Sequence, residues 1–501
     1  MNANLFAVIE SRMPADRESI CIEAEGGQRW TWADLDRETA RLAAYLASLG
    51  LAPGARVAVQ VDKSPAALFL YLATLRAGLA FLPLNTAYQA SEIDYFIGDA
   101  EPSVVVCGPR QQPWFEPIAQ AHGVKHCLTL GEDGTGSLTE AARSFPETFE
   151  TVNCHGDDLA AILYTSGTTG RSKGAMLSHR NLVSNALTLC QYWRWRAGDV
   201  LIHALPIFHV HGLFVASHCA LLSQSRMIWL NRFDPVEVCR HLPRASVFMG
   251  VPTMYVRLLE EPALSRACAA SMRLFISGSA PLLTDTFKQF EERTGHRILE
   301  RYGMSETVML SSNPYDGNRV AGTVGLPLPG VEIRIRGEGG ALCPSGVIGG
   351  IEVRGPNVFS AYWRMPEKTR EEFTDDGWFR TGDVGQWDAN GYLSIVGRSK
   401  DLIITGGYNV YPKEIEGWLD EIEGVFESAV FGIPHRDFGE AVTAAVVARP
   451  GVQLDALALI AELKTRIASF KVPKQIHIVA QLPRNQMGKV QKNLLRNQFG
   501  A

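Results

Sequence analysis

A stretch rich in glycine and hydroxyl side chains, Tyr164–Gly174, constrains the fold of this chain more than any other part of it. An apolar run with the length of a buried strand, Leu159–Leu163, precedes it, and a new regular segment begins at Ala175. Glycines let backbone N–H groups approach a ligand closely, while hydroxyls and Lys173 add donors and positive charge. Such a composition commonly forms a flexible surface loop. Here its position directly after a predicted strand and the positive charge of Lys173 favour a phosphate-binding loop instead.

This loop differs from the Walker pattern, because its lysine does not directly follow the last glycine. We expect its backbone and side chains to surround a polyphosphate. The residues predicted to do so are Thr165, Ser166, Gly167, Thr168, Thr169, Gly170 and Lys173.

The chain length of 501 residues is too great for one hydrophobic core and predicts at least two domains. Hydrophobic residues make up 46% and charged residues 20%, as in ordinary globular proteins. A net charge of −5 argues against a nucleic-acid partner. The 9 cysteines form no C-x-x-C pair, and no signal-like N-terminus or long apolar run is present. We therefore expect reduced thiols in a cytoplasmic protein that does not span a membrane.

Strand-like and helix-like segments alternate along the chain. Arg56–Val61 and Val104–Cys107 have the pattern of strands, and Ser64–Ala77 has that of a helix. A longer helix is predicted to begin with a capping box made by Thr31 and Asp34. This order predicts an α/β architecture of layers around a parallel sheet.

Several later motifs carry candidate functional residues. Each of them alone is typical of an ordinary turn, a packed histidine, a surface arginine or a solvated lysine. The pair His209 and His211 lacks a neighbouring cysteine or carboxylate, so it is weak evidence for a metal site. What favours function is the order of the motifs along one chain, which is Ser277–Pro281, Leu299–Thr307, Trp378–Asp383, Gly391–Asp401 and Pro483–Gln491.

Together with the phosphate loop, these motifs resemble those of the adenylate-forming (AMP-binding) superfamily, which includes the acyl-CoA synthetases. The resemblance covers most of the chain. It implies a large N-terminal layered α/β domain over residues 1–399 and a small, mobile C-terminal α+β domain over residues 400–501. It also implies a hinge at Lys400, about which one active site is rearranged between two half-reactions.

The resemblance implies specific contacts with ATP and coenzyme A. The ribose hydroxyls would be bound by Asp383 and Arg398, since a carboxylate can accept from two adjacent hydroxyls. Glu306 would hold Mg²⁺, and Lys489 would be catalytic, bridging a carboxylate and the α-phosphate, two anions that otherwise repel each other. The adenine would lie between Gly278, Ser279 and Ala280 on one side and Tyr302 on the other. Glu300 and Ser305 would also belong to the cofactor site. The tunnel for the coenzyme A thiol would include Gly406, Gly407 and Tyr408.

Within the superfamily, the chain most closely resembles the malonyl-CoA synthetases, through runs such as Gly250–Arg257 and Glu300–Met304. Malonate keeps a second carboxylate that must stay ionised in the pocket, and a buried anion needs a cationic partner. The resemblance assigns this carboxylate to Arg301, Arg257, Ser279 and His209, the last also as a catalytic group. It places Val210 and Met309 beside the carbon between the carboxyl groups.

The predicted function is therefore an ATP-dependent malonate–CoA ligase that uses ATP, Mg²⁺ and coenzyme A. Only twelve residues follow Lys489, so no fused carrier domain is expected and a free thiol is the predicted acceptor. Two alternatives remain open at this point. One is a synthetase for a monocarboxylic fatty or aryl acid, and the other is a nucleotide-binding regulator that has lost catalysis.

Overall fold

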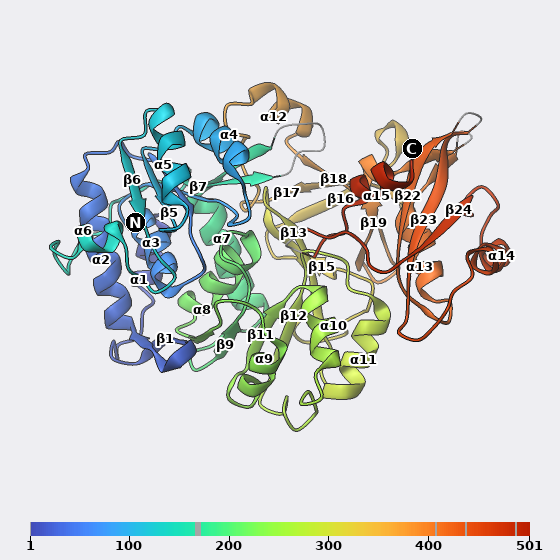
Figure 1. Cartoon of the computed structure of the whole chain (residues 1–501), viewed down its shortest axis with the longest axis horizontal. Helices are drawn as coiled ribbons and strands as arrows, with labels where there is room; N and C mark the ends of the chain where they lie inside the picture. The colour runs from blue at the N-terminus through green and yellow to red at the C-terminus, as the bar shows by residue number, and fades with distance from the viewer. Residues whose placement is uncertain (1, 166–171, 406–407, 436–437, 486–487, 501) are drawn as a thin grey trace.

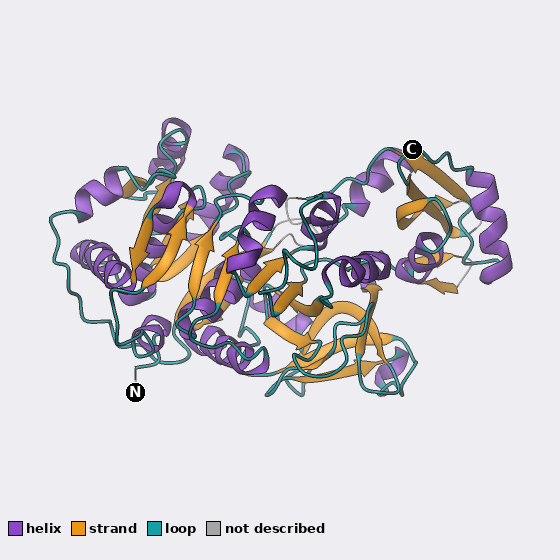
Figure 2. Ribbon diagram, turned by 90° about the horizontal axis from the view of Figure 1, so that it is seen from below, coloured by secondary structure: helices purple, strands orange, loops and turns teal. Residues whose placement is uncertain are grey.

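The computed structural model describes residues 2–165, 172–405, 408–435, 438–485 and 488–500 (Figure 1). A large N-terminal part and a smaller C-terminal part lie side by side along the long axis (Figures 1 and 2). The buried hydrophobic clusters on the two sides of Lys400 share no member among the described residues. The predicted domain limits agree with this division of the cores but remain a prediction.

The largest sheet forms the middle of the N-terminal part. Its central strands, β9 to β13, pair in parallel, whereas β14 and β15 return antiparallel. In spatial order the strands are β15 (Leu326–Pro327), β14 (Val308–Ser312), β13 (Leu299–Met304), β12 (Leu274–Ser277), β11 (Val247–Gly250), β9 (Val200–His203), β10 (Arg226–Trp229), β1 (Ile20–Ala24) and β2 (Arg29–Thr31).

A second sheet holds the strand before the phosphate loop. It is parallel except for its last pair, in which β7 and β8 run antiparallel. In spatial order the strands are β6 (His126–Thr129), β5 (Val104–Cys107), β3 (Arg56–Gln60), β4 (Ala80–Pro83), β7 (Leu159–Thr165) and β8 (Lys173–Ser178).

Helices pack against both sheets. The helix α3 (Pro65–Arg76) is apolar on all sides and almost entirely buried, as expected for a helix in the middle of a core. The helix α2 (Trp32–Ser48) packs against it and begins with the predicted capping box of Thr31 and Asp34. The other helices of this part are α1 (Leu5–Glu10), α4 (Ala90–Ala100), α5 (Gln112–Ala121), α6 (Ser137–Ala142), α7 (His179–Tyr192), α8 (His218–Leu222), α9 (Pro235–His241), α10 (Pro252–Glu260), α11 (Thr284–Thr294) and α12 (Pro366–Glu372).

A small antiparallel sheet connects the two parts. Its strands are β16 (Glu332–Arg336), β17 (Gly349–Arg354), β18 (Phe379–Trp387) and β19 (Leu393–Arg398). One face is apolar and buried, and the other carries charged side chains. A short 3₁₀ turn, Ser399–Asp401, then leads into the C-terminal part.

The C-terminal part is a mixed sheet flanked by helices. Its strands are β20 (Ile403–Thr405), β21 (Tyr408–Val410), β22 (Val425–His435), β23 (Gly439–Ala448) and β24 (Gln475–Val479). Its helices are α13 (Pro412–Asp420), α14 (Ala456–Arg466) and α15 (Lys492–Phe499).

The fold confirms the predicted α/β class, with a correction to the sheet. The parallel sheet that was expected is mixed, because antiparallel hairpins extend its edges. All nine cysteines lie in the described residues, and each is a free thiol. In the part of the chain that the structure describes, no helix is long and apolar enough to cross a membrane.

Candidate functional site

The phosphate loop connects two antiparallel strands rather than a strand and a helix. Thr165 and Lys173 are direct partners across the β7–β8 pair, so they stand at the two ends of the loop. The predicted contacts Ser166, Gly167, Thr168, Thr169 and Gly170 lie outside the described residues. The ammonium of Lys173 lies 3.1 Å from Glu372 Oε1 on α12 and 4.3 Å from the centre of the Tyr362 ring.

Glu306 stands beside the base of this loop. It follows β13 in a tight turn next to the half-buried Ser305, and its side chain is buried. Its Oε1 accepts hydrogen bonds from the hydroxyls of Tyr362 at 3.0 Å and Thr165 at 3.5 Å. Burial raises the pKa of Glu306, so an ionised carboxylate here gains stability from a nearby cation.

The carboxylate of Asp383 is held by two groups that the sequence motifs also contain. Asp383 on β18 and Arg398 on β19 are direct cross-strand partners, and their side chains form an ion pair at 2.9 Å. The hydroxyl of Tyr302 donates to the other carboxylate oxygen of Asp383 at 2.5 Å. The structure thus brings three separated motifs together at one carboxylate.

The small-residue turn after β12 has a strained backbone. Ser279 adopts φ +71°, a left-handed conformation that is unusual for a residue other than glycine. Gly278 lets the Arg301 guanidinium pack against the backbone, because a Cβ atom there would lie 2.6 Å from the guanidinium carbon. Glu300 supports the turn, since its Oε1 accepts from the backbone N–H of Leu282. Ala280 is half-buried.

Arg301 is a buried arginine whose guanidinium is only partly satisfied by the residues that the structure describes. Only 3% of the residue is exposed, and neither Nε nor Nη2 has a hydrogen-bond partner among the described residues. Burial lowers its pKa to about 9, which still leaves it charged at neutral pH. A buried cation of this kind is costly without an anion.

Two histidines lie near enough to Arg301 for its charge to affect both: His209, just before the π-helix His211–Ser217, and His211 at its first position. The pKa of His209 is lowered to about 3 by burial and by the positive charges of Lys489 and Arg301. The same effects of burial and of Arg301 lower the pKa of His211 well below its usual value. Both imidazoles are therefore neutral at physiological pH.

The remaining predicted acid contacts fall into two groups. Val210 and Met309 are buried near these histidines, at the N-cap of the π-helix and on β14. Arg257 has an exposed side chain on α10, one turn beyond Thr253. Of the two predicted arginines, only Arg301 is buried in this structure, and the predicted contact of Arg257 with the second carboxylate stays a prediction.

Lys489 reaches the site from the C-terminal part. The backbone of Gly488 packs against the Thr253 side chain, and Arg449 forms an ion pair with Asp285. By solvent accessibility Lys489 is exposed, so water still reaches its side chain, although protein atoms around it displace part of that water. Burial and Arg398 lower its pKa to about 8, while Asp383 and Glu306 oppose that shift.

The predicted hinge and the predicted coenzyme A tunnel both precede Lys489 in the sequence. Lys400 is exposed in the 3₁₀ turn between the two parts. Tyr408 begins β21, whereas Gly406 and Gly407 lie outside the described residues.

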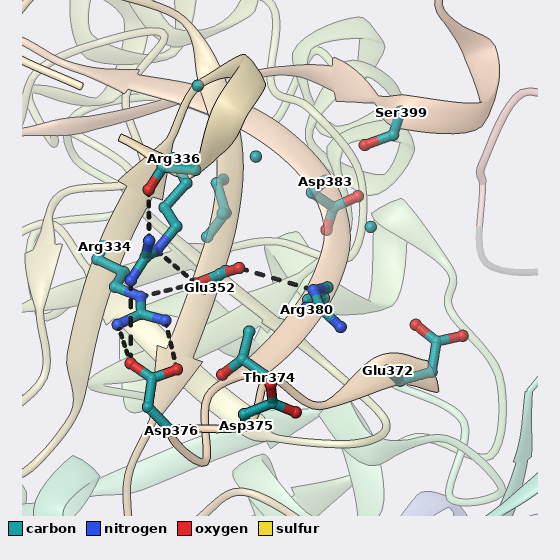
Figure 3. Close-up of a pocket in the computed structure, with 15 residues that line it drawn as sticks. Arg334, Arg336, Glu352, Glu372, Thr374, Asp375, Asp376, Arg380, Asp383 and Ser399 are labelled. Carbon is teal, nitrogen blue, oxygen red and sulfur yellow. Dashed lines mark hydrogen bonds and ion pairs between the residues drawn. The ribbon is translucent and has the colours of Figure 1, made fainter. Parts of the chain in front are cut away.

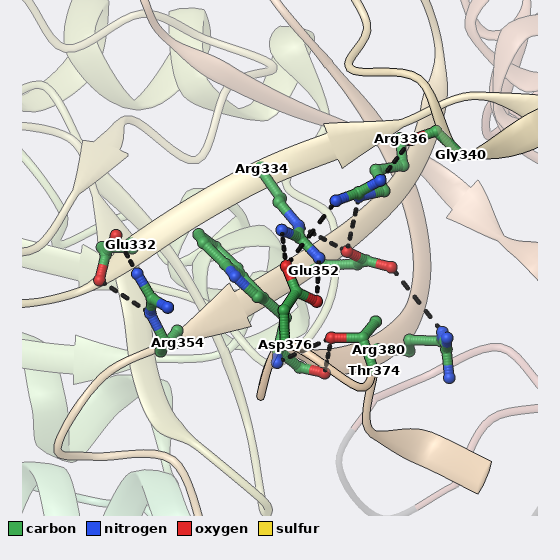
Figure 4. Close-up of polar contacts among 10 residues, drawn as sticks. Glu332, Arg334, Arg336, Gly340, Glu352, Arg354, Thr374, Asp376 and Arg380 are labelled. Atoms are coloured by element: carbon green, nitrogen blue, oxygen red, sulfur yellow. Dashed lines mark hydrogen bonds and ion pairs between the residues drawn. The ribbon is translucent and has the colours of Figure 1, made fainter.

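A cavity of about 700 Å³ adjoins Asp383 and is enclosed on its far side by the charged face of the small sheet (Figure 3). Here Glu352 lies between three guanidinium groups, at 2.6 Å from Arg334, 3.3 Å from Arg336 and 3.7 Å from Arg380. Arg334 also contacts both oxygens of Asp376 (Figure 4). Each of these three arginines already has a protein carboxylate as a partner, either Glu352 alone or Glu352 and Asp376.

Sequence reasoning missed three residues that the structure places at the site: Tyr362, Glu372 and His211. The first two lie in a segment between motifs, where nothing in the sequence distinguishes them from core and surface residues. His211 was considered only as part of a weak metal pair. Contacts with Glu306, Lys173 and Ser279 reveal them, and these are contacts across the fold.

Comparisons with known proteins are consistent with this geometry. Residues 9–363 match the family described as AMP-binding enzyme, and residues 414–489 match its C-terminal domain family. A malonate–CoA ligase of Arabidopsis thaliana is 37% identical, over 89% of this chain and 78% of that protein. ATP-bound MatB from Rhodopseudomonas palustris is 55% identical, with a TM-score of 0.97 over 100% of this chain and 99% of that one. The apo form of MatB, equally identical and equally covered, gives a TM-score of 0.87.

Proposed function

The chain belongs to the AMP-binding enzyme family, and from this premise we propose that it is an ATP-dependent malonate–CoA ligase. The reaction forms malonyl-CoA, AMP and pyrophosphate through a malonyl-adenylate. A carboxylate oxygen attacks the α-phosphorus of ATP and pyrophosphate departs. The thiol of coenzyme A then attacks the acyl carbon and AMP departs.

One observation carries the choice of malonate. Arg301 is buried at 3% exposure, and two of its guanidinium nitrogens have no hydrogen-bond partner in the described part of the chain. A monocarboxylate offers only the carboxyl group that reacts, which would leave this cation unpaired. The second carboxylate of malonate supplies the missing anion. Relatives named as malonate–CoA ligases support the same proposal.

The first half-reaction must bring two anions together, and the cations of the site serve this purpose. Lys489 lies among Arg398, Asp383, Glu306 and Arg301, so its ammonium can contact both the attacking carboxylate and the α-phosphate. Lys173, at the end of the phosphate loop, would neutralise the departing pyrophosphate. Asp383, held by Arg398 and Tyr302, would accept from the ribose hydroxyls.

The residues present fit a Mg²⁺ site that is completed by substrate phosphates. In the described residues no cluster of three or more potential metal ligands exists. Mg²⁺ sites in nucleotide enzymes commonly use one or two carboxylates and the phosphates themselves. Glu306, oriented by Tyr362 and Thr165, provides such a carboxylate. When bound, Mg²⁺ neutralises charge on the phosphates.

The second half-reaction requires access for a thiol. We propose that the C-terminal part rotates about Lys400, which removes Lys489 and brings the segment around Tyr408 to the site. The exposed position of Lys400 in a short turn supports this assignment. Relatives named as CoA ligases support coenzyme A as the acceptor.

An acid panel tests the proposed function. The purified enzyme is assayed by ATP–pyrophosphate exchange with acetate, butyrate, octanoate, benzoate, malonate, methylmalonate and succinate, and the thioester is identified by mass spectrometry. We expect malonate to give the highest kcat/KM, methylmalonate a lower value and simple monocarboxylates the lowest. A preference for octanoate or benzoate would replace the proposal by a monocarboxylate synthetase.

A further inference from the structure

The hydrogen bonds of His211 determine where the ring proton of His209 and the hydroxyl proton of Ser279 lie. Its backbone N–H donates to Nδ1 of His209 at 3.3 Å. Its own Nδ1 lies 3.4 Å from the hydroxyl oxygen of Ser279. The residue is completely buried, and its Nε2 has no partner among the described residues. His211 therefore contacts both neutral groups that are proposed to bind the second carboxylate.

The contact with His209 fixes a tautomer. A backbone N–H can only donate, so Nδ1 of His209 must accept. A neutral imidazole that accepts at Nδ1 carries its proton on Nε2. The neutral state follows from the burial of His209 and from the neighbouring charges of Lys489 and Arg301. His209 is thereby prepared to donate from Nε2 to an oxygen in the pocket.

The contact with Ser279 has two possible directions. If the hydroxyl donated to His211, its proton would be used and only lone pairs would face an anion. His211 Nε2 would then carry a buried N–H without a partner, which is rare in folded proteins. If Nδ1–H of His211 donates instead, every buried N–H of the ring is satisfied. The Ser279 proton is then free to be donated to an anion.

The backbone of Ser279 gives independent support. At φ +71° a serine is strained, and glycine would adopt this conformation at lower cost. The strain is compatible with a requirement for the hydroxyl at this position. The backbone next to His211 is also closely packed, because a Cβ on Gly212 would lie 2.1 Å from the Pro206 carbonyl oxygen.

We propose that His211 is a positioning residue that directs the protons of His209 and Ser279 toward the carboxylate that does not react. This inference rests on the proposed function, since it requires an acid with a second carboxylate. His211 itself does not touch the acid; its backbone N–H acts through His209 and its Nδ1–H acts through Ser279.

A double-mutant cycle tests the side-chain part of the proposal. The variants are Ser279→Ala, His211→Leu and the double substitution, each assayed for kcat/KM with malonate and with butyrate. A hydrogen bond to a charged group supports a loss of about 10- to 100-fold with malonate for each single variant. If His211 acts through Ser279, the double variant loses no more than about threefold beyond the worse single variant. Losses that multiply would overturn the proposal.

A matched pair of polar substitutions guards against misfolding. His211→Asn places an amide nitrogen near the position of Nδ1, whereas His211→Gln places it near that of Nε2. We expect His211→Asn to keep the malonate-to-butyrate ratio within about fivefold of wild type and His211→Gln to lower it as His211→Leu does. Equal ratios for the two variants would assign His211 a packing role and overturn the proposal. If wild type itself prefers butyrate, the proposed function fails, whatever the cycle shows.

Discussion

Arg301 and Arg334 are both largely buried, yet their surroundings differ in kind. Arg334, on the small sheet, contacts Glu352 and both oxygens of Asp376 (Figure 4). Its guanidinium also lies over the Trp378 ring, 4.2 Å from the ring centre. Arg301, beside the turn after β12, has two buried nitrogens without a partner among the described residues. The first network is complete within the protein, whereas the second lacks an anion.

This difference distinguishes an arginine that stabilises the fold from an arginine that can bind an anionic ligand. A buried guanidinium with its carboxylates is neutral as a unit and holds strands in register. A buried guanidinium without them raises the free energy of the folded state, a cost that an anionic substrate can offset on binding. The cavity near Asp383 shows that arginines at a concave surface do not by themselves indicate an anion site, because its arginines are already paired.

The largest expected effect is that of Arg301→Ala on malonate. Removing one partner of a buried ion pair costs roughly 3–5 kcal/mol. At about 1.4 kcal/mol per tenfold, kcat/KM for malonate should fall by a hundredfold to a few thousandfold. The fall with butyrate should be far smaller, because butyrate has no second charge. Steady-state kinetics with both acids measure this, and equal losses would make Arg301 structural like Arg334.

Arg334→Ala should lower stability and leave the preference between the two acids unchanged. It leaves Glu352 with weaker partners and should lower the free energy of unfolding by about 1–3 kcal/mol, measured in urea. The malonate-to-butyrate ratio should stay as in wild type. Arg354→Ala is the matched control: its ion pair with Glu332 is half-exposed, so its loss should stay below about 1 kcal/mol. A changed acid preference in Arg334→Ala would contradict the distinction between the two arginines.

The pH dependence separates Lys489 from Arg301. Burial lowers the pKa of Lys489 to about 8, so the free enzyme loses this charge as the pH rises through that value. If the ammonium form is required, kcat/KM for adenylation is constant below about pH 8 and falls toward tenfold per unit above it. Both acids should follow the same curve below about pH 9, where Arg301 keeps its charge, and malonate alone should fall more steeply once Arg301 also loses its proton. A rate that rises through pH 8 would make neutral Lys489 the active form.

The smallest expected effect concerns the strained turn. Ser279→Gly and Ser279→Ala both remove the hydroxyl, but only glycine relieves the left-handed backbone. The glycine variant should be more stable than the alanine variant by about 1 kcal/mol in urea unfolding, with malonate activity reduced in both. Equal stabilities would show that the turn relaxes and that Ser279 is not held in a strained conformation for the sake of its hydroxyl.

The sequence predicted the α/β class and several segments well, because their signals are local. The capping box at Thr31 follows from residue spacing, and the apolar run Leu159–Leu163 predicts the strand that the structure extends to Thr165. Asp383 and Arg398 could be paired only through family resemblance, although the structure shows them as cross-strand partners. Tyr362 and His211 could not be predicted, since their partners Glu306 and Ser279 are distant in the chain. The exposure of Arg257 likewise depends on which face of α10 packs inward.

The central claim is that Arg301 lacks an anion which malonate supplies. Its most direct test is the stabilisation that malonate gives in the presence of a non-hydrolysable ATP analogue, measured as the shift in unfolding free energy. A ligand at a hundred times its Kd stabilises by about 2.7 kcal/mol. The account predicts this shift at matched malonate concentration for wild type and for Arg334→Ala, but little or none for Arg301→Ala. A shift of equal size in all three proteins would contradict it.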